Sequence, residues 1–229
     1  MIRVTESLGQ VRKTLQNEAA ATGRDAAAIR LVAVSKRHPE AAIRAAWAAG
    51  QRDFGENFVD EGVAKITALG DCPSTWHYIG AMQSNKTRQI AQHFDWVHTV
   101  ERAKIATRLN DQRPPERGPL EVCIQVNIDQ EPQKAGITPA ALHELANMVA
   151  KAPNLRLRGL MCLPRPRGPD ENAREPFARL RALLETLRLD HPELDTLSMG
   201  MSGDLGAAIA EGATIVRVGT AIFGPRPAR

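Results

Sequence analysis

The chain has 229 residues, of which 43% are hydrophobic and 24% are charged, and its formal net charge is +4. This length suits one domain covering residues 1–229, and the composition is that of a globular protein with a sizeable core, which excludes a disordered chain. No apolar stretch approaches the roughly 20 residues that span a bilayer, and the N-terminal MIRVTESLGQ lacks the apolar core of a signal peptide. We therefore expect a cytoplasmic protein without a membrane partner.

An amphipathic segment opens the chain, with one helical stripe formed by Val4, Leu8, Val11 and Leu15. Eight short apolar runs follow, each typical of a buried β-strand and separated from the next by a helical pattern. The runs cover residues 30–35, 52–54, 75–79, 95–98, 121–127, 156–161, 195–198 and 214–218.

The helical patterns between the runs carry their own start and stop signals. The pattern AAIRAAWAAG ends at Gly50, and TPAALHELANMV begins with Thr138 as a cap and Pro139 in the first turn. In DFGENFVDEG, the acidic residues Glu56, Asp60 and Glu61 favour a helix that begins at Asn57 and has them in its first turn. Ser84 is the candidate cap in IGAMQSNK, a segment that could equally form a wall of a site.

Eight strand-then-helix units predict an α/β protein, a single-domain (β/α)8 TIM barrel with an extra N-terminal helix. Parallel strands need crossover helices, and eight strands close the sheet without leaving an edge. A doubly wound open sheet is the alternative.

In such barrels the active site is built at the C-terminal ends of the strands. The residues expected there are Lys36, Asn57, residues 77–80, Asn127, Met161, residues 198–204, Arg217, Gly219 and Thr220.

Lys36 follows the first run, LVAVS. Strand alternation places Lys36 on one face with Val32 and Val34, so its amine can point into the barrel. A desolvated lysine near another cation, here Arg37 or Arg217, has a lowered amine pKa, and this favours imine formation with an aldehyde. The alternative is an ordinary solvated lysine at a strand end.

Two glycine-containing segments follow the last two strands. In GMSGDLGAAIAEG, Ser202 can cap a helix whose first-turn amides form an anion site. RVGTAIFG follows the eighth run, and barrels tend to bind phosphate with the loops after strands seven and eight. Ordinary glycine turns are the alternative for either segment.

Arg217 lies on the same strand face as Ile215 and is therefore expected inside the barrel. An unpaired buried guanidinium is costly, so Arg217 needs a partner. A structural carboxylate would suffice, and a ring nitrogen or phosphate of a bound cofactor is the functional choice. Lys134, in the loop after strand five, is a second amine near the rim, where a solvated lysine is the simpler interpretation.

Residues 151–181 contain eight Lys or Arg against three Asp or Glu. No nucleic-acid motif or aromatic ladder accompanies this excess, so a solvated basic face is favoured and no nucleic-acid partner is expected. The three cysteines are scattered and the six histidines lack ligand spacing, so no metal site is predicted.

Several motifs together resemble the pyridoxal phosphate homeostasis protein family, the group similar to the N-terminal barrel domain of alanine racemase. They are LVAVSK, FGENFVDE, WHYIGAMQSNK, NIDQEPQKAGI, RGLMCLP and LSMGMSGDLGAAIAEGATIVRVGTAIFG, in family order along nearly the whole chain. The resemblance implies a protein that binds pyridoxal 5'-phosphate (PLP).

Carried over residue by residue, the resemblance makes Lys36 the Schiff-base lysine and Arg217 the partner of the pyridine nitrogen. Ser202, Gly219 and Thr220 become phosphate contacts, with Gly203 in the same cofactor-binding set, and Asn57 lies beside the cofactor. The sequence gives Lys134 no clear role, because Gln133 and Ala135 depart from the family pattern around it.

The resemblance implies a carrier and buffer of PLP that supports vitamin B6 and amino-acid balance, expected as a monomer with PLP-dependent apoenzymes as recipients. A PLP-dependent racemase-like enzyme is the alternative, and a cofactor-free aldolase is a distant third. A racemase of this type adds a tyrosine base from a second domain, whereas the single tyrosine here, Tyr78, lies in the third run. The carrier is therefore favoured, with no catalytic residue predicted.

Overall fold

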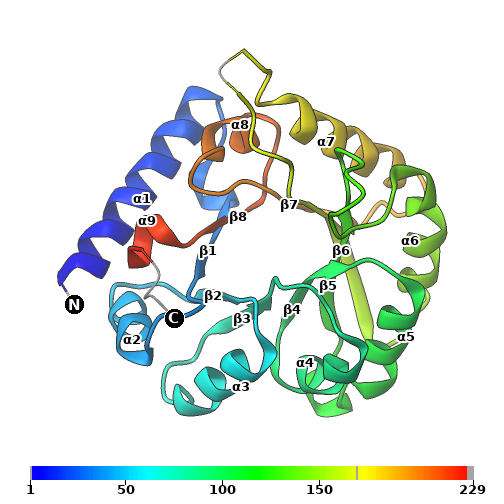
Figure 1. Cartoon of the computed structure of the whole chain (residues 1–229), viewed down its shortest axis with the longest axis horizontal. Coiled ribbons are helices and arrows are strands. Elements are labelled where there is room, and N and C mark those ends of the chain that lie inside the picture. The colour runs from blue at the N-terminus through cyan, green and yellow to red at the C-terminus, as the bar shows by residue number, and fades with distance from the viewer. Residues whose placement is uncertain (1, 169, 226–229) are drawn as a thin grey trace.

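The computed structural model describes residues 2–168 and 170–225. Within them, eight parallel strands close into a barrel in the order β1-β2-β3-β4-β5-β6-β7-β8, with helices around it (Figure 1). The strands are β1 (Arg30–Val34), β2 (Asp53–Glu56), β3 (Thr75–Tyr78), β4 (Trp96–Val100), β5 (Leu120–Val126), β6 (Leu155–Cys162), β7 (Thr196–Ser198) and β8 (Ile215–Val218). The predicted (β/α)8 barrel is confirmed, and the open sheet is not observed.

The helices follow the strands in alternation. They are α1 (Ile2–Ala21), α2 (Glu40–Ala48), α3 (Val59–Ala68), α4 (Thr87–His93), α5 (Ala103–Gln112), α6 (Leu142–Ala150), α7 (Glu175–Leu187), α8 (Leu205–Ala210) and α9 (Thr220–Phe223). Short 3-10 turns lie at η1 (Ala26–Ala28), η2 (Ser84–Lys86), η3 (Pro115–Arg117) and η4 (Pro139–Ala141). Not one of the described helices is both long enough and apolar enough to cross a membrane.

The predicted extra N-terminal helix is α1, which packs against α8, α9 and α2 (Figure 1). Its predicted stripe faces inward, because Leu8, Val11 and Leu15 are buried and Val4 is half-buried against the core. The helix therefore covers the side of the barrel where β8 returns to β1.

The core has two layers that follow from strand alternation. Leu31 and Ala33 of β1 belong to the large apolar layer between the barrel and its helices. Val32, on the other face, belongs to a smaller cluster inside the barrel. The other members of this inner cluster are Trp96, Cys123, Met161 and Ile215.

One predicted helix start is wrong and another is confirmed in position. Asn57 lies in a bend, because β2 continues through Glu56, which pairs with Tyr78 of β3, and α3 begins only at Val59. Thr138 is the residue before η4, which has Pro139 in its first turn as predicted and leads directly into α6, although the Thr138 side chain forms no capping hydrogen bond. The stop signal at Gly50 is confirmed, because α2 ends at Ala48 and Gly50 has a φ of 85°.

The basic segment 151–181 is offset by carboxylates. Each of its seven arginines forms an ion pair, and several partners come from outside the segment. The pairs are Arg156–Glu121, Arg158–Glu121, Arg158–Asp195, Arg165–Glu171, Arg167–Asp129, Arg167–Glu175, Arg174–Glu211, Arg179–Glu175, Arg181–Glu185 and Arg181–Glu211. The local excess of positive charge counted along the sequence is therefore much smaller in space.

Candidate functional site

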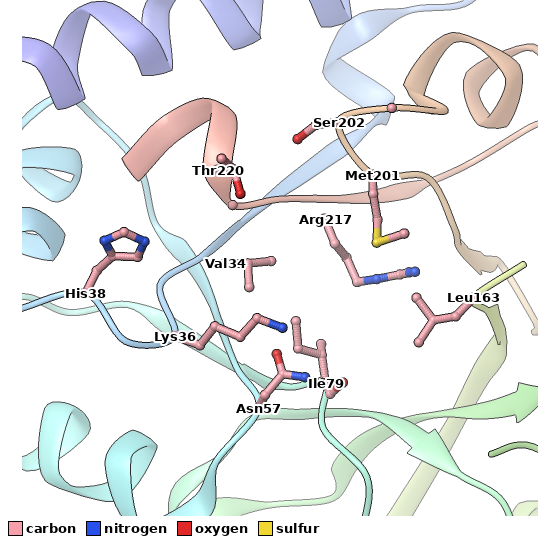
Figure 2. A pocket seen from close by; sticks show the side chains of 12 residues that line it. Val34, Lys36, His38, Asn57, Ile79, Leu163, Met201, Ser202, Arg217 and Thr220 are labelled. Carbon is pink, nitrogen blue, oxygen red and sulfur yellow. Dashed lines mark hydrogen bonds between the residues drawn. The ribbon is translucent and has the colours of Figure 1, made fainter. Parts of the chain in front are cut away.

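A cavity of about 370 Å³ opens at the C-terminal ends of the strands. It brings together all seven residues predicted to bind the cofactor: Lys36, Asn57, Ser202, Gly203, Arg217, Gly219 and Thr220. They come from four parts of the chain, after β1, after β2, after β7 and at the end of β8. Figure 2 shows the side chains of five of them around one central space, namely Lys36, Asn57, Ser202, Arg217 and Thr220.

Lys36 supplies the amine of this cavity. It follows β1 by two residues and lies on the same face as Val34, which also lines the cavity. Figure 2 shows its side chain extending into the cavity beside Asn57 and toward Ile79. Lys36 itself is half-buried, so the strand geometry turns it away from bulk solvent.

The backbone on both sides of Lys36 is fixed by hydrogen bonds. Arg37 has a φ of 64°, a left-handed conformation that is unusual for a residue other than glycine. Its N–H donates to Glu61 Oε1 at 2.5 Å, and the His38 N–H donates to the Ser35 carbonyl at 3.0 Å. The tight turn directs the chain away immediately after Lys36 and is stabilised by the Glu61 carboxylate.

A cluster of three charged side chains, Lys65, Glu56 and Glu61, stabilises the same turn. Lys65 Nζ donates to the Ser35 carbonyl at 2.7 Å, to Glu56 Oε1 at 2.8 Å and to Glu61 Oε1 at 2.6 Å. Ser35 Oγ also donates to Glu56 Oε1 at 2.6 Å. Burial raises the pKa of Glu56, and the Lys65 ammonium acts in the opposite direction. Glu56, predicted in a helical turn, is instead part of a charged support for the Lys36 turn.

Arg217 enters the barrel as predicted and is buried. Its Nη1 donates to Ser198 Oγ at 2.6 Å and its Nη2 donates to the Cys162 carbonyl at 3.0 Å. Among the described residues, no carboxylate forms an ion pair with Arg217, so the structural-carboxylate interpretation is wrong. Burial lowers the pKa of the guanidinium. A fixed, buried donor therefore borders the cavity.

The turn after β7 differs from its prediction. Helix α8 begins at Leu205 with Asp204 at its N-terminal boundary, so Ser202 does not cap it. Asp204 Oδ1 accepts a hydrogen bond from the Met201 N–H at 2.5 Å and holds the turn in place. Ser202 and Gly203 are exposed, and their N–H groups donate to no other described residue, so both can donate to a ligand.

Asn57 has an unused acceptor. Its side-chain nitrogen donates to the Ile79 carbonyl at 3.5 Å, whereas its Oδ1 is buried without a hydrogen-bond partner in the described structure. Buried polar atoms usually have partners, so an unpaired oxygen beside the Lys36 amine fits a site that receives a polar ligand.

Other residues expected at the strand ends lie elsewhere. His77 is inside β3 and bonds to other side chains of the barrel interior. Met161 belongs to the inner apolar cluster. Asn127 closes its own loop by donating to the Glu131 carbonyl, and Lys134 forms an ion pair with Glu131 at 2.6 Å. The cavity lining does not include these four.

The cavity also contains side chains outside the predicted cofactor-binding set. Val34, Ile79, Leu163 and Met201 form apolar walls, and His38 stacks on Phe223 with ring centroids 5.2 Å apart at the edge. The alternation that placed Lys36 could have predicted Val34. Ile79 and Met201 fall within the segments 77–80 and 198–204 that were expected at the strand ends, whereas no local signal identifies Leu163, which lies in an irregular segment after β6.

The donor set suits an organic anion with an aldehyde group rather than a metal ion. No cluster of three or more His, Cys, Asp or Glu suited to a metal occurs among residues 2–168 and 170–225. The cavity instead combines an amine, a guanidinium, hydroxyl and N–H donors, and apolar walls. Such a site can bind a planar phosphate ester and present an amine to its carbonyl carbon.

Comparisons with known proteins identify relatives that share this arrangement of the whole chain. Residues 8–227 match the family model "Alanine racemase, N-terminal domain". The chain is 54% identical over 226 residues to the pyridoxal phosphate homeostasis protein of Pseudomonas aeruginosa, covering 99% of this chain and 97% of that protein. It is 51% identical to the protein of the same name from Escherichia coli K12, covering 97% of each. The solved structure of PipY from Synechococcus elongatus PCC7942 with PLP bound matches at a TM-score of 0.84 and 39% identity, covering 96% of this chain and 100% of PipY.

Proposed function

Because the chain belongs to the pyridoxal phosphate homeostasis protein family, we propose that it binds PLP in the cavity and acts as a cytoplasmic carrier and buffer of this cofactor. The observation that carries the proposal is the Lys36 amine, inside one cavity with the buried Arg217 and the exposed donors of the Ser202 turn. The support for PLP as the ligand is the PLP-bound structure of PipY.

The residues of the cavity have distinct roles in this proposal. PLP, when bound, supplies an aldehyde that condenses reversibly with a primary amine. Lys36 presents that amine, and Arg217 donates toward the pyridine nitrogen. The phosphate is bound by the donors of Ser202, Gly203, Gly219 and Thr220, which meet at the rim.

A carrier fits better than a racemase. A guanidinium at the pyridine nitrogen does not promote protonation of the ring, and ring protonation is what favours carbanion chemistry. Tyr78 is the single tyrosine of the sequence. Its hydroxyl donates to the Ala81 carbonyl at 2.9 Å, and burial raises its pKa to about 12, so Tyr78 is poorly suited to act as a base.

The proposal also names partners. PLP-dependent apoenzymes are the proposed recipients, since a buffer of a reactive aldehyde must release it to proteins that use it. Nucleic acid is not among the proposed partners, because the arginines of residues 151–181 are paired with carboxylates such as Glu121 and Glu211.

The proposal is tested by adding PLP to the purified protein, recording the visible absorbance spectrum, reducing with borohydride and mapping the labelled peptide. We expect a pyridoxyl group on Lys36, and we expect Lys36→Ala to lose the covalent label. Lys134→Ala is the matched control, because Lys134 is another rim amine that lies outside the cavity lining. A Lys36→Ala protein that keeps the full amount of label, or a wild-type protein that takes up none, would contradict the proposal.

A further inference from the structure

A continuous line of hydrogen bonds crosses the inside of the barrel below Arg217. Asp53 is the first residue of β2, and its Oδ1 lies 3.0 Å from His77 Nε2. His77 Nδ1 lies 2.9 Å from His98 Nε2, and His98 Nδ1 lies 2.6 Å from Ser198 Oγ. Ser198 Oγ accepts from Arg217 Nη1 at 2.6 Å. The line connects the N-terminal rim of the barrel with the cavity at its other end.

The two charged ends fix the direction of every bond in this line. An ionised Asp53 carboxylate only accepts, so His77 carries its proton on Nε2. A neutral His77 then accepts at Nδ1, which requires the proton of His98 on Nε2. His98 in turn accepts at Nδ1 from the Ser198 hydroxyl, which leaves a Ser198 lone pair for Arg217.

The neutral state of both imidazoles follows from their surroundings. His77 and His98 are fully buried, and each has the other as a neighbour. Burial lowers the pKa of both rings, and the positive charge of Arg217 contributes at His98. A neutral pair is therefore the state in which each ring has one donor and one acceptor for its two neighbours.

The line of hydrogen bonds also compensates for the lack of a carboxylate next to Arg217. The guanidinium is buried among a hydroxyl and a carbonyl, with no ion pair to a described carboxylate. A buried cation without a carboxylate is costly unless its donors are satisfied and oriented dipoles offset its charge. Ser198, His98 and His77 are oriented in one sense and end on the Asp53 carboxylate, so they provide such a set of dipoles.

We propose that Asp53, His77, His98 and Ser198 form a relay of positioning residues that orients Arg217 and offsets its charge from the opposite end of the barrel. This inference rests on the proposed function only where Arg217 is said to face the bound PLP; the relay itself is a property of the protein. Through Ser198, it holds the Nη1 edge of the guanidinium and leaves the cavity side available to the ligand.

The relay is tested first on the protein without PLP. Histidine labelled with ¹⁵N reports the protonation of each ring nitrogen by NMR, with assignments from His77→Gln and His98→Gln variants. We expect His77 and His98 to be neutral at pH 7, each with its proton on Nε2. A proton on Nδ1 of either ring, or a charged ring, would overturn the relay.

Two variants then test whether the relay acts on Arg217. Ser198→Ala removes the link next to Arg217, and Ser198→Thr keeps the hydroxyl as the conservative rescue. Asp53→Asn removes the charge at the far rim, so the direction of the bonds is no longer fixed. Asp195→Asn is the matched control, because Asp195 lies directly before β7, pairs with Arg158 and takes no part in the relay.

We expect Asp53→Asn and Ser198→Ala to mix the histidine tautomers, shift the Arg217 side-chain resonances and weaken PLP binding by roughly threefold to thirtyfold. Ser198→Thr and Asp195→Asn should resemble the wild type. If Asp53→Asn changes only the unfolding midpoint, with tautomers and PLP affinity as in Asp195→Asn, the relay is wrong. If the wild type shows the expected tautomers but takes up no PLP, the proposed function fails and the NMR result still decides the relay.

Discussion

The surroundings of Lys36 depend on a few buried charges. Lys65 is buried and bridges Glu56 and Glu61. Lys65 donates to the Ser35 carbonyl and Glu61 accepts from the Arg37 N–H, so the backbone is held on both sides of Lys36. Such a cluster is costly to assemble, because charges lose hydration, but removing Lys65 costs more, since Glu56 then remains buried without its cation. The position of the Lys36 amine therefore depends on the charge balance among Lys65, Glu56 and Glu61.

Lys65→Met should lower the free energy of unfolding by about 3 kcal/mol at neutral pH, because it leaves two carboxylates without their cation. The loss should be smaller in mildly acidic buffer, because burial raises the pKa of Glu56 and this carboxyl group can then be protonated. Urea unfolding at two pH values measures both effects. Lys86→Met is the matched control, because Lys86 pairs with Asp60 at an exposed position, and its loss should cost about 0.5 kcal/mol or less. Equal losses for the two variants would contradict the role given to Lys65.

His77 and His98 make stability depend on pH. Burial lowers their folded-state pKa values below the ordinary 6.5, so the unfolded chain binds more protons below that pH. Stability contributed by the neutral rings is present above pH 6.5 and is lost as the pH falls toward the folded-state pKa values. Between pH 7 and pH 5.5 the two rings together should cost roughly 2 kcal/mol.

The measurement is the difference in unfolding free energy between wild type and His98→Gln across this range. This difference isolates the contribution of the His98 ring. The raised pKa of Glu56 changes stability with pH in the opposite sense, but it does so in both proteins and therefore cancels. A difference that stays constant with pH would show that His98 titrates as it does in the unfolded chain, and a wild-type advantage that grows as the pH falls would show that His98 is charged in the folded protein.

At the scale of elements, close backbone contacts between neighbouring loops position the segments that carry the site. The segment after β3 passes against the bend that contains Asn57, and a Cβ at Gly80 would lie 2.0 Å from the Asn57 carbonyl oxygen. Thr99 of β4 donates to the Gly80 carbonyl at 2.7 Å and holds the segment there. The position of Asn57 at the cavity therefore depends on the absence of a side chain in a neighbouring loop.

Gly80→Ala should destabilise the protein by about 2 kcal/mol and weaken PLP binding, because the backbone at Asn57 must move. The same substitution at Gly9, which is exposed within α1 and has open space around its Cα, should stabilise by about 1 kcal/mol. Thermal unfolding and PLP titration of the two variants check the contrast. Gly80→Ala with wild-type stability would show that the two loops are not in firm contact.

At the scale of the whole molecule, the fold leaves few surfaces for self-association. The described strands form a closed barrel without an open sheet edge, and edge strands are the usual route to strand pairing between chains. Three large apolar side chains of the described residues are exposed, namely Phe58, Leu189 and Met201, and they come from separate segments.

We expect a monomer of 25.0 kDa in solution. Light scattering coupled to size-exclusion chromatography measures the mass directly, with and without PLP. A mass of twice this value at every concentration would contradict the expectation. If only the PLP-bound protein doubled in mass, association would depend on the cofactor, and the expectation of a monomeric carrier would be wrong.

The sequence determined the barrel, its extra N-terminal helix and the residues that meet at its mouth. These depend on local signals: strand alternation places Lys36 and Arg217 inward, and the ends of parallel strands lie on one side of a barrel. The helix start at Asn57 was wrong, because acidic first-turn residues occur equally well in bends. The start at Thr138 was right in position, with Pro139 in the first turn, but this turn is a 3-10 turn and Thr138 forms no side-chain cap. The family resemblance, which the comparisons confirm, added the ligand that the residues alone left open.

Only the tertiary structure decided which buried polar side chains contact one another next to the site. His98 and Ser198 are 100 residues apart in the chain, and Ser35 and Lys65 are 30 apart, so no local pattern announces either contact. Each of these side chains has a simpler interpretation as an ordinary polar residue of a strand or helix. They become partners because barrel closure and helix packing bring distant elements together in the buried interior, where each polar group needs a hydrogen-bond partner.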